Sequence, residues 1–131
     1  MNILIPLGGK GERFKKKNYT LPKSLINIFG KPIIFYLLDS LNLNSIDLVY
    51  IPYNEEYSEF NIENKIQKRY PKIKFQFLKL EIQTRGAVET INIALKKYNL
   101  GNKPILCLDG DNFYQIDIIK LWNGKNRIFT I

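Results

Sequence analysis

Segments with the apolar repeat of a β-strand alternate with segments that have the repeat of an α-helix along nearly all of this chain. Such an order predicts right-handed βαβ units, which place the strands in a mostly parallel sheet with helices on both faces. We therefore expect an α/β protein built as a Rossmann-like three-layer sandwich. In such sheets, ligands bind beyond the carboxyl ends of the strands.

The expected strands are short apolar runs, whereas the expected helices repeat their apolar residues every three or four positions. Strands are predicted at residues 2–7, 46–52, 73–80, 104–108 and 127–131. One helix is predicted to begin at Pro32, and a second to span residues 56–70 before Pro71. A third is predicted to run from Gly86 to a stop at Gly101 and Asn102. The apolar face of the last helix is expected to consist of Val88, Ile91, Leu95 and Tyr98.

The length and composition fit one domain over residues 1–131, because 45% of the residues are hydrophobic, enough for a core. No apolar run approaches the roughly 20 residues that span a bilayer. The N-terminus lacks the features of a signal peptide. The single cysteine, Cys107, lies in an apolar run and is expected to pack there, without an internal disulfide. These features predict a cytoplasmic protein.

The chain has no histidine, which excludes a histidine-based triad or dyad and a histidine-ligated zinc. Catalysis would have to use carboxylates, cations, hydroxyl or backbone groups, or a metal held by oxygen. The net charge of +8 is typical of proteins that bind phosphorylated ligands or nucleic acid. Most of the lysines are scattered, and only residues 10–23 combine a cluster of cations with glycines.

The segment that follows the first expected strand, residues 7–23, holds three glycines and six cations. Glycine adopts backbone angles closed to other residues, so the chain can approach a ligand closely here. Backbone N–H groups beside cations suit a polyanion such as a nucleoside triphosphate. The glycines are Gly8, Gly9 and Gly11, and the best-placed cations are Lys10, Arg13 and Lys23.

Two common phosphate-binding motifs are absent from this segment. The dinucleotide-binding motif G-x-G-x-x-G fails because Phe14 stands in place of the third glycine. A Walker A loop ends in Gly-Lys followed by Ser or Thr, which this loop lacks. What remains is a glycine-rich turn followed by Arg13 and, further on, by Pro22-Lys23.

Four segments, in order, resemble the nucleotidyltransferases that make NDP-sugars and related activated metabolites. They are residues 8–14 with 21–25, residues 30–33, residues 83–89 and residues 109–112. The resemblance covers residues 3–113 and implies the nucleotide-binding part of a GT-A-like fold. It further implies an enzyme that transfers NMP from an NTP to a phosphorylated acceptor, with a sugar 1-phosphate as the expected acceptor and Mg²⁺ as cofactor.

The resemblance also implies roles for particular residues. Arg13 and Lys23 would be the catalytic cations, with Arg13 on the leaving pyrophosphate and Lys23 between the α-phosphate and the acceptor phosphate. Asp111 would ligate Mg²⁺, a cation that prefers oxygen ligands. The nucleotide-binding residues would be Leu7, Gly8, Gly9, Lys10, Gly11, Gln83, Gly86 and Asp109, of which Gln83 and Gly86 belong to the segment that reads the base.

Each of these residues also has a structural alternative. Lys23 could be an exposed loop lysine, and Asp109 and Asp111 could simply form a tight turn. Gln83 and Gly86 could be no more than a loop and a helix start. Residues 15–17, three lysines in a row, are expected to be a solvated run.

The sequence departs from the family pattern in two respects. Glu12 stands where many members have Thr or Ser, so it must point away from the phosphates or contact another group. The acceptor pocket and a second metal-binding aspartate belong to a later part of the family's domain. The chain is therefore expected to be either a fragment of an enzyme or a reduced nucleotide-binding remnant.

Other functions stay open at this point. The acceptor could be a non-sugar phosphate such as phosphocholine, as in cytidylyltransferases, or the chain could be a non-catalytic nucleotide-binding module. A nucleic-acid partner is disfavoured because few aromatic residues interleave with the basic cluster. A membrane span is not expected, and the sequence is compatible with a homo-oligomer.

Overall fold

A four-stranded parallel sheet lies at the centre of the computed structural model, which describes residues 1–126 and 128. The strand order is β5-β4-β1-β6, and every neighbouring pair is parallel. The bounds are Asn2–Leu4 for β1, Leu48–Tyr53 for β4, Phe75–Lys79 for β5 and Ile105–Cys107 for β6. The predicted parallel sheet is confirmed. The strand predicted at residues 127–131 lies outside the described residues, apart from residue 128.

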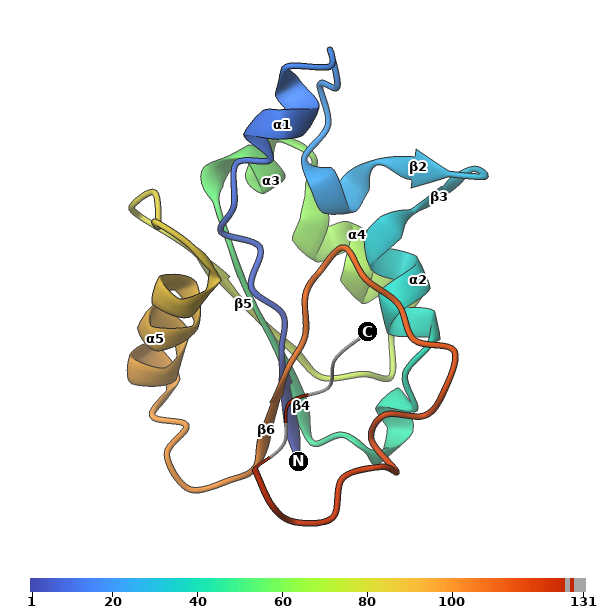
Figure 1. Ribbon diagram of the computed structural model, residues 1–131, viewed down its shortest axis with the longest axis vertical. Coiled ribbons are helices and arrows are strands. Elements are labelled where there is room, and N and C mark those ends of the chain that lie inside the picture. Colours follow the sequence, from blue (N-terminus) through green and yellow to red (C-terminus); the bar gives the residue numbers. More distant parts are fainter. Residues whose placement is uncertain (127, 129–131) are drawn as a thin grey trace.

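Helices cover both faces of this sheet, with α5 on one side and α2 and α4 on the other (Figure 1). Their bounds are Ile33–Asp39 for α2, Ile62–Arg69 for α4 and Ala87–Tyr98 for α5. Shorter elements are α1 (Glu12–Lys15), α3 (Glu55–Glu59), the 3₁₀ turns Lys23–Leu25 and Leu43–Ser45, and a hairpin of β2 (Asn27–Ile28) and β3 (Lys31–Pro32). In the described part of the chain, no helix is long and apolar enough to cross a membrane.

The alternation of side chains along the strands explains the three layers. In β1, Ile3 packs in a core cluster that includes Leu37 of α2 and Ile66 of α4. Its neighbour Leu4 points to the opposite face and packs in a cluster with Ala94 of α5. The predicted three-layer α/β sandwich is therefore confirmed.

The first strand is shorter than the predicted range 2–7 because Pro6 has no N–H to donate. The parallel pairing with β4 nevertheless resumes beyond β1, where Ile5 N–H donates to Tyr50 O (2.9 Å) and Leu7 N–H donates to Pro52 O (2.8 Å). Leu7 is thereby held against the end of β4, and the glycine segment begins at a fixed point.

The single helix predicted over residues 56–70 is wrong. The chain forms α3 and α4 instead, and Asn61 between them has the left-handed backbone angles φ 53 and ψ 49. Asparagine tolerates this conformation better than most residues. The break allows Tyr57 of α3 and Ile66 of α4 both to point into the core, where their side chains are 2% and 0% exposed.

Three smaller expectations about residues 88–107 are also corrected. Val88 is 82% exposed, and the fully buried residues of α5 are Thr90 and Ala94. The helix ends at the left-handed Asn99, before the predicted stop at Gly101 and Asn102. Cys107 is exposed, because β6 lies at the edge of the sheet.

The strand order places a topological switch point between β1 and β6. The chain moves outward from β1 to β4 and β5, and then returns to the other side of β1 to form β6. Ligands bind at such points, beyond the carboxyl ends of the strands. The glycine segment follows β1, and the Asp109–Asp111 segment follows β6.

Candidate functional site

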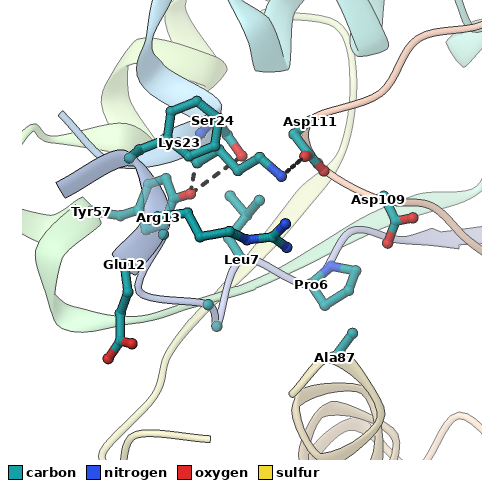
Figure 2. Close-up of a pocket in the computed structure, with 15 residues that line it drawn as sticks. Pro6, Leu7, Glu12, Arg13, Lys23, Ser24, Tyr57, Ala87, Asp109 and Asp111 are labelled. Carbon is teal, nitrogen blue, oxygen red and sulfur yellow. Dashed lines mark hydrogen bonds and ion pairs between the residues drawn. The ribbon is translucent and has the colours of Figure 1, made fainter. Parts of the chain in front are cut away.

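A cavity of about 440 Å³ opens at this switch point, and Figure 2 shows the residues that line it. It is lined by Pro6, Leu7, Gly8, Gly9, Gly11, Glu12, Arg13, Phe14, Lys23, Ser24, Tyr57, Ala87, Asp109, Gly110 and Asp111. The fold therefore brings together two segments that lie about 100 positions apart in the sequence. Hereafter we call this cavity the donor cavity, after the NTP that the family resemblance predicts as the donor of the transferred group.

The glycine segment needs glycine at Gly8 for a steric reason. A Cβ on Gly8 would lie 2.6 Å from Oγ1 of Thr84 and closer still to Oγ1 of Thr90. These two buried hydroxyls are 2.7 Å apart and hydrogen-bonded to each other, at the start of α5. Gly8 thus allows the loop to pass directly against α5. Gly11 has φ 60, in the left-handed region, where it precedes α1.

Two side-chain amides hold the carbonyl groups of this loop. Nδ2 of Asn54 donates to Gly8 O (3.3 Å) and to Gly9 O (2.9 Å). Nε2 of Gln83 donates to the same Gly8 O (3.1 Å). Peptide groups are planar, so the N–H groups that follow these carbonyls, those of Gly9 and Lys10, point away from Asn54. Successive exposed N–H groups of this kind form anion-binding concavities.

The two predicted catalytic cations both line the donor cavity. Figure 2 shows that the side chains of Arg13 and Lys23 extend from the same side of the cavity toward the two aspartates. Glu12 also lies on the rim, but its carboxylate points away from this cluster (Figure 2). The negative charge that departs from the family pattern is therefore directed away from the site.

Lys23 forms an ion pair with Asp111. Lys23 begins a 3₁₀ turn whose next residue, Ser24, is buried. Ser24 Oγ accepts a hydrogen bond from the Tyr57 hydroxyl at 3.2 Å. Burial raises the pKa of Tyr57, so its hydroxyl keeps its proton at neutral pH. The turn that carries Lys23 is thus attached to α3.

Asp109 and Asp111 supply the carboxylates of the cavity. Leu108 N–H donates to Leu4 O (3.0 Å), so the chain stays in parallel register with β1 until just before Asp109. The described residues contain no group of three or more carboxylate or thiol side chains that could enclose a metal ion. One or two carboxylates facing a phosphate site nevertheless fit Mg²⁺, which is held in such sites together with substrate phosphates.

Three of the predicted nucleotide-binding residues do not line the donor cavity. Lys10 and Gln83 line an adjoining hollow of about 400 Å³ that also includes Glu55 and Leu80. Gly86 precedes α5, and its neighbour Ala87 lines the donor cavity instead. Gln83 is therefore in contact with the glycine loop from the outside, and a role in reading the base stays a prediction.

The lysines predicted to be a solvated run differ from one another in their surroundings. Lys15 forms an ion pair with Glu56 of α3. Lys16 and Lys17 line a further hollow, of about 560 Å³, with Arg13, Phe14 and Lys23. The positive charge of this loop is therefore continuous with the donor cavity.

Sequence reasoning missed Asn54, Ser24 and Tyr57. An Asn directly after a strand and before a helix is a recognisable N-cap, and Oδ1 of Asn54 indeed accepts from Glu56 N–H (3.0 Å). That signal predicts the cap but not the contact with Gly8 and Gly9. The contact between Tyr57 and Ser24 joins residues 33 positions apart and has no local signal.

Comparisons with known proteins identify the family of the chain. The sequence model of the family described as "Nucleotidyl transferase" matches residues 3–124. The chain therefore belongs to the nucleotidyltransferase family, as the sequence motifs predict.

Curated relatives include two bacterial D-glycero-α-D-manno-heptose 1-phosphate guanylyltransferases. The protein of Aneurinibacillus thermoaerophilus is 28% identical over 122 residues, which cover 93% of this chain and 51% of the relative. The protein of Campylobacter jejuni is 27% identical over 129 residues, which cover 98% of this chain and 55% of the relative. The chain thus spans about half the length of these two relatives.

Solved structures with the same fold include a nucleoside-diphosphate-sugar pyrophosphorylase from Vibrio cholerae, with a TM-score of 0.70 and 22% identity over 91% of this chain and 52% of that one. HddC from Yersinia pseudotuberculosis, solved in complex with GMP-PN, has a TM-score of 0.73 and 22% identity, over 92% of this chain and 52% of that one. These similarities confirm the α/β fold of the nucleotidyltransferases.

Proposed function

We propose that this chain forms the nucleoside triphosphate site of an Mg²⁺-dependent nucleotidyltransferase that transfers NMP to a sugar 1-phosphate and releases pyrophosphate. The observation that carries the proposal is the donor cavity, where Arg13 and Lys23 face Asp109 and Asp111 at the switch point of the sheet. Family membership and the named activities of the two guanylyltransferases support it.

The chemistry suits a site without histidine. An oxygen of the acceptor phosphate attacks the α-phosphorus of the NTP, and the bond from that phosphorus to the bridging oxygen of pyrophosphate breaks. A phosphate monoester has a second pKa of about 6, so the attacking oxygen is already ionised at neutral pH and needs no general base. Catalysis then consists of positioning two polyanions and neutralising their charge.

The residues of the cavity and the neighbouring Lys10 divide this task between them. The N–H groups of Gly9 and Lys10 and the guanidinium of Arg13 would bind the β- and γ-phosphates, which leave as pyrophosphate. The ammonium of Lys23 would stabilise charge at the α-phosphate and on the acceptor phosphate. Asp111, with Asp109 beside it, would hold Mg²⁺, which when bound neutralises phosphate charge.

Guanine is the base that we propose first. Two relatives are named as guanylyltransferases, and HddC was solved with a guanine nucleotide. Nε2 of Gln83 is engaged by Gly8 O and by its neighbour Thr84 O, both at 3.1 Å. In the part of the chain that the structure describes, no group donates to Oε1 of Gln83, which leaves this oxygen to accept from a base. Guanine presents suitable donors at N1–H and at its exocyclic amino group.

The first test is equilibrium binding of GTP, ATP, CTP, UTP and dTTP to the 131-residue chain with Mg²⁺ present. We expect GTP to bind, with an affinity that falls as salt is added, because the contacts are ionic. The second test is pyrophosphate release from the bound nucleotide with sugar 1-phosphates, and with phosphocholine as the non-sugar alternative. Failure to bind any NTP would contradict the proposal, whereas NTP binding without turnover by the full-length protein would favour the non-catalytic module.

A further inference from the structure

The short helix α3 places two buried polar side chains against the two cationic segments of the donor cavity. Asn54 is the N-cap residue of α3, and Tyr57 lies three positions further on, so both side chains are on one side of the helix. Asn54 is 4% exposed and Tyr57 is 2% exposed. Buried polar groups are costly unless they are hydrogen-bonded, so their partners indicate what each group does.

Every polar atom of the Asn54 side chain has a partner. Its Oδ1 accepts from Glu56 N–H at 3.0 Å and caps α3. Its Nδ2 donates to the carbonyls of Gly8 and Gly9, at 3.3 Å and 2.9 Å. A single amide therefore ties the first turn of α3 to the backbone of the glycine loop and fixes the direction of the peptide groups there.

Tyr57 makes the second attachment. Its hydroxyl donates to Ser24 Oγ (3.2 Å) and accepts from Ser24 N–H (3.4 Å). Ser24 follows Lys23 directly, and Figure 2 shows the Tyr57 hydroxyl beside the backbone that carries the Lys23 side chain. The same helix thus contacts the loop that would bind the phosphates and the turn that bears the lysine.

We propose that Asn54 and Tyr57 are positioning residues of the nucleotide site, and that α3 sets the distance between the glycine loop and Lys23. This inference rests on the proposed function, because it assigns both residues to the same cavity. Asn54 would act through the peptide groups of Gly8 and Gly9. Tyr57 would act through Ser24, and neither residue takes part in the transfer itself.

The chain offers a matched control for Tyr57. Tyr53 of β4 is 4% exposed and also donates its hydroxyl hydrogen bond to a side chain, that of Glu63, but it does not line the donor cavity. Tyr53→Phe therefore removes a buried, hydrogen-bonded hydroxyl from the same core without changing the proposed contact. Ser24→Ala removes the bond between the Tyr57 hydroxyl and Ser24 Oγ from its other end and keeps the bond from Ser24 N–H.

The test measures GTP–Mg²⁺ binding, exchange of the Ser24 amide hydrogen and the free energy of unfolding for Tyr57→Phe, Ser24→Ala, their double variant and Tyr53→Phe. We expect Tyr57→Phe to speed exchange at Ser24 and to weaken GTP binding by about tenfold, since both hydrogen bonds between its hydroxyl and Ser24 are lost. The double variant should bind no more weakly than Tyr57→Phe alone, since Tyr57→Phe already removes both bonds to Ser24. Tyr53→Phe should lose stability and bind GTP as the wild type does.

For Asn54, the variant Asn54→Ser keeps a capping hydroxyl for α3 but has no amide to reach the loop. We expect lower NMR order parameters at Gly9 and Lys10 and GTP binding weaker by about tenfold, since two hydrogen bonds are lost. Unchanged order parameters would contradict the role of Asn54.

Two results would overturn the role of Tyr57. One is unchanged exchange at Ser24 in Tyr57→Phe, and the other is an equal loss of GTP binding in Tyr53→Phe. If the wild-type chain binds no NTP, the proposed function fails separately. The exchange and order-parameter measurements then still decide whether Asn54 and Tyr57 hold these two segments.

Discussion

Lys23, from the turn after the glycine loop, forms an ion pair with Asp111, from the segment after β6. Both side chains are about one-third exposed, with values of 38% and 30%. The residue proposed to bind phosphate is therefore paired with the residue proposed to bind Mg²⁺. Before the nucleotide enters, the ammonium of Lys23 neutralises the carboxylate that the metal would use.

The first prediction is that Lys23→Gln binds a divalent cation more tightly when no nucleotide is present. Removal of the ammonium leaves Asp111 free, and an exposed ion pair of this kind is worth up to about 1 kcal/mol, or roughly fivefold in affinity. Titration with Mn²⁺, followed by its electron paramagnetic resonance signal, measures this directly. Lys31→Gln is the matched control, because it removes one charge from an ion pair with Asp39, outside the donor cavity. Equal affinities in wild type and Lys23→Gln would show that the two cations do not compete.

A second prediction concerns Gly8. Gly8→Ala should lower the free energy of unfolding by about 1–3 kcal/mol, because its Cβ would clash with the hydroxyls of Thr84 and Thr90. Gly9→Ala is the matched control: no heavy atom lies within 4 Å of the position of its Cβ. Urea unfolding of the two variants compares them. A loss of equal size in both would mean that the loop can move away from α5.

The third prediction concerns Asp39, at the end of α2. Burial alone would raise the pKa of this carboxyl group, but hydrogen bonds from Tyr70, Lys31 and Arg69 outweigh it and lower the pKa. Because the pKa is lower in the folded than in the unfolded protein, the stabilisation is fully present above the unfolded value of about 3.9 and is lost as the pH falls through the folded pKa.

Asp39→Asn should therefore lower the free energy of unfolding at pH 7 by about 1 kcal/mol, a figure that allows for solvent screening of a side chain that is one-third exposed. The difference from wild type should shrink as the pH falls below about 4. Urea unfolding at pH 7 and at pH 3 measures it. A difference that stays constant over this range would assign the effect to packing instead of charge.

The architecture could be predicted from the sequence because it depends on local periodicity. A continuous apolar run marks β4 and an alternation of apolar and polar residues marks β5, and the connection rules then order the strands. The break at Asn61 was not predicted, because the residues whose spacing indicates the helix, Ile62, Ile66 and Tyr70, all lie after it. The exposure of Val88 likewise depends on what α5 packs against, which its own sequence does not contain.

The candidate site divides in the same way. Lys23 and Asp111 could be predicted because each follows an expected strand or motif, and parallel strands end at one edge of the sheet. Their ion pair, and the attachment of Ser24 to Tyr57, could not, because side-chain partners across the fold leave no periodic signal. For Gln83, the motif predicts that the residue lies near the site, but the sequence does not predict its hydrogen bond to Gly8 O.

The last prediction is that Asp111→Asn changes GTP affinity in opposite directions without and with Mg²⁺. In the absence of Mg²⁺, Asp111→Asn should bind GTP more tightly than wild type, because a negative charge is removed from the phosphate site and Lys23 is released. With Mg²⁺, wild type should gain affinity and the variant should gain little, since the proposed metal ligand is missing. Isothermal titration of wild type and variant with GTP, with and without Mg²⁺, gives the four dissociation constants.

The control is Asp117→Asn, which alters a carboxylate outside the donor cavity and should bind GTP as wild type does in both conditions. If Asp111→Asn keeps the full gain from Mg²⁺, then Asp111 is not the metal ligand and its carboxylate serves only to hold Lys23.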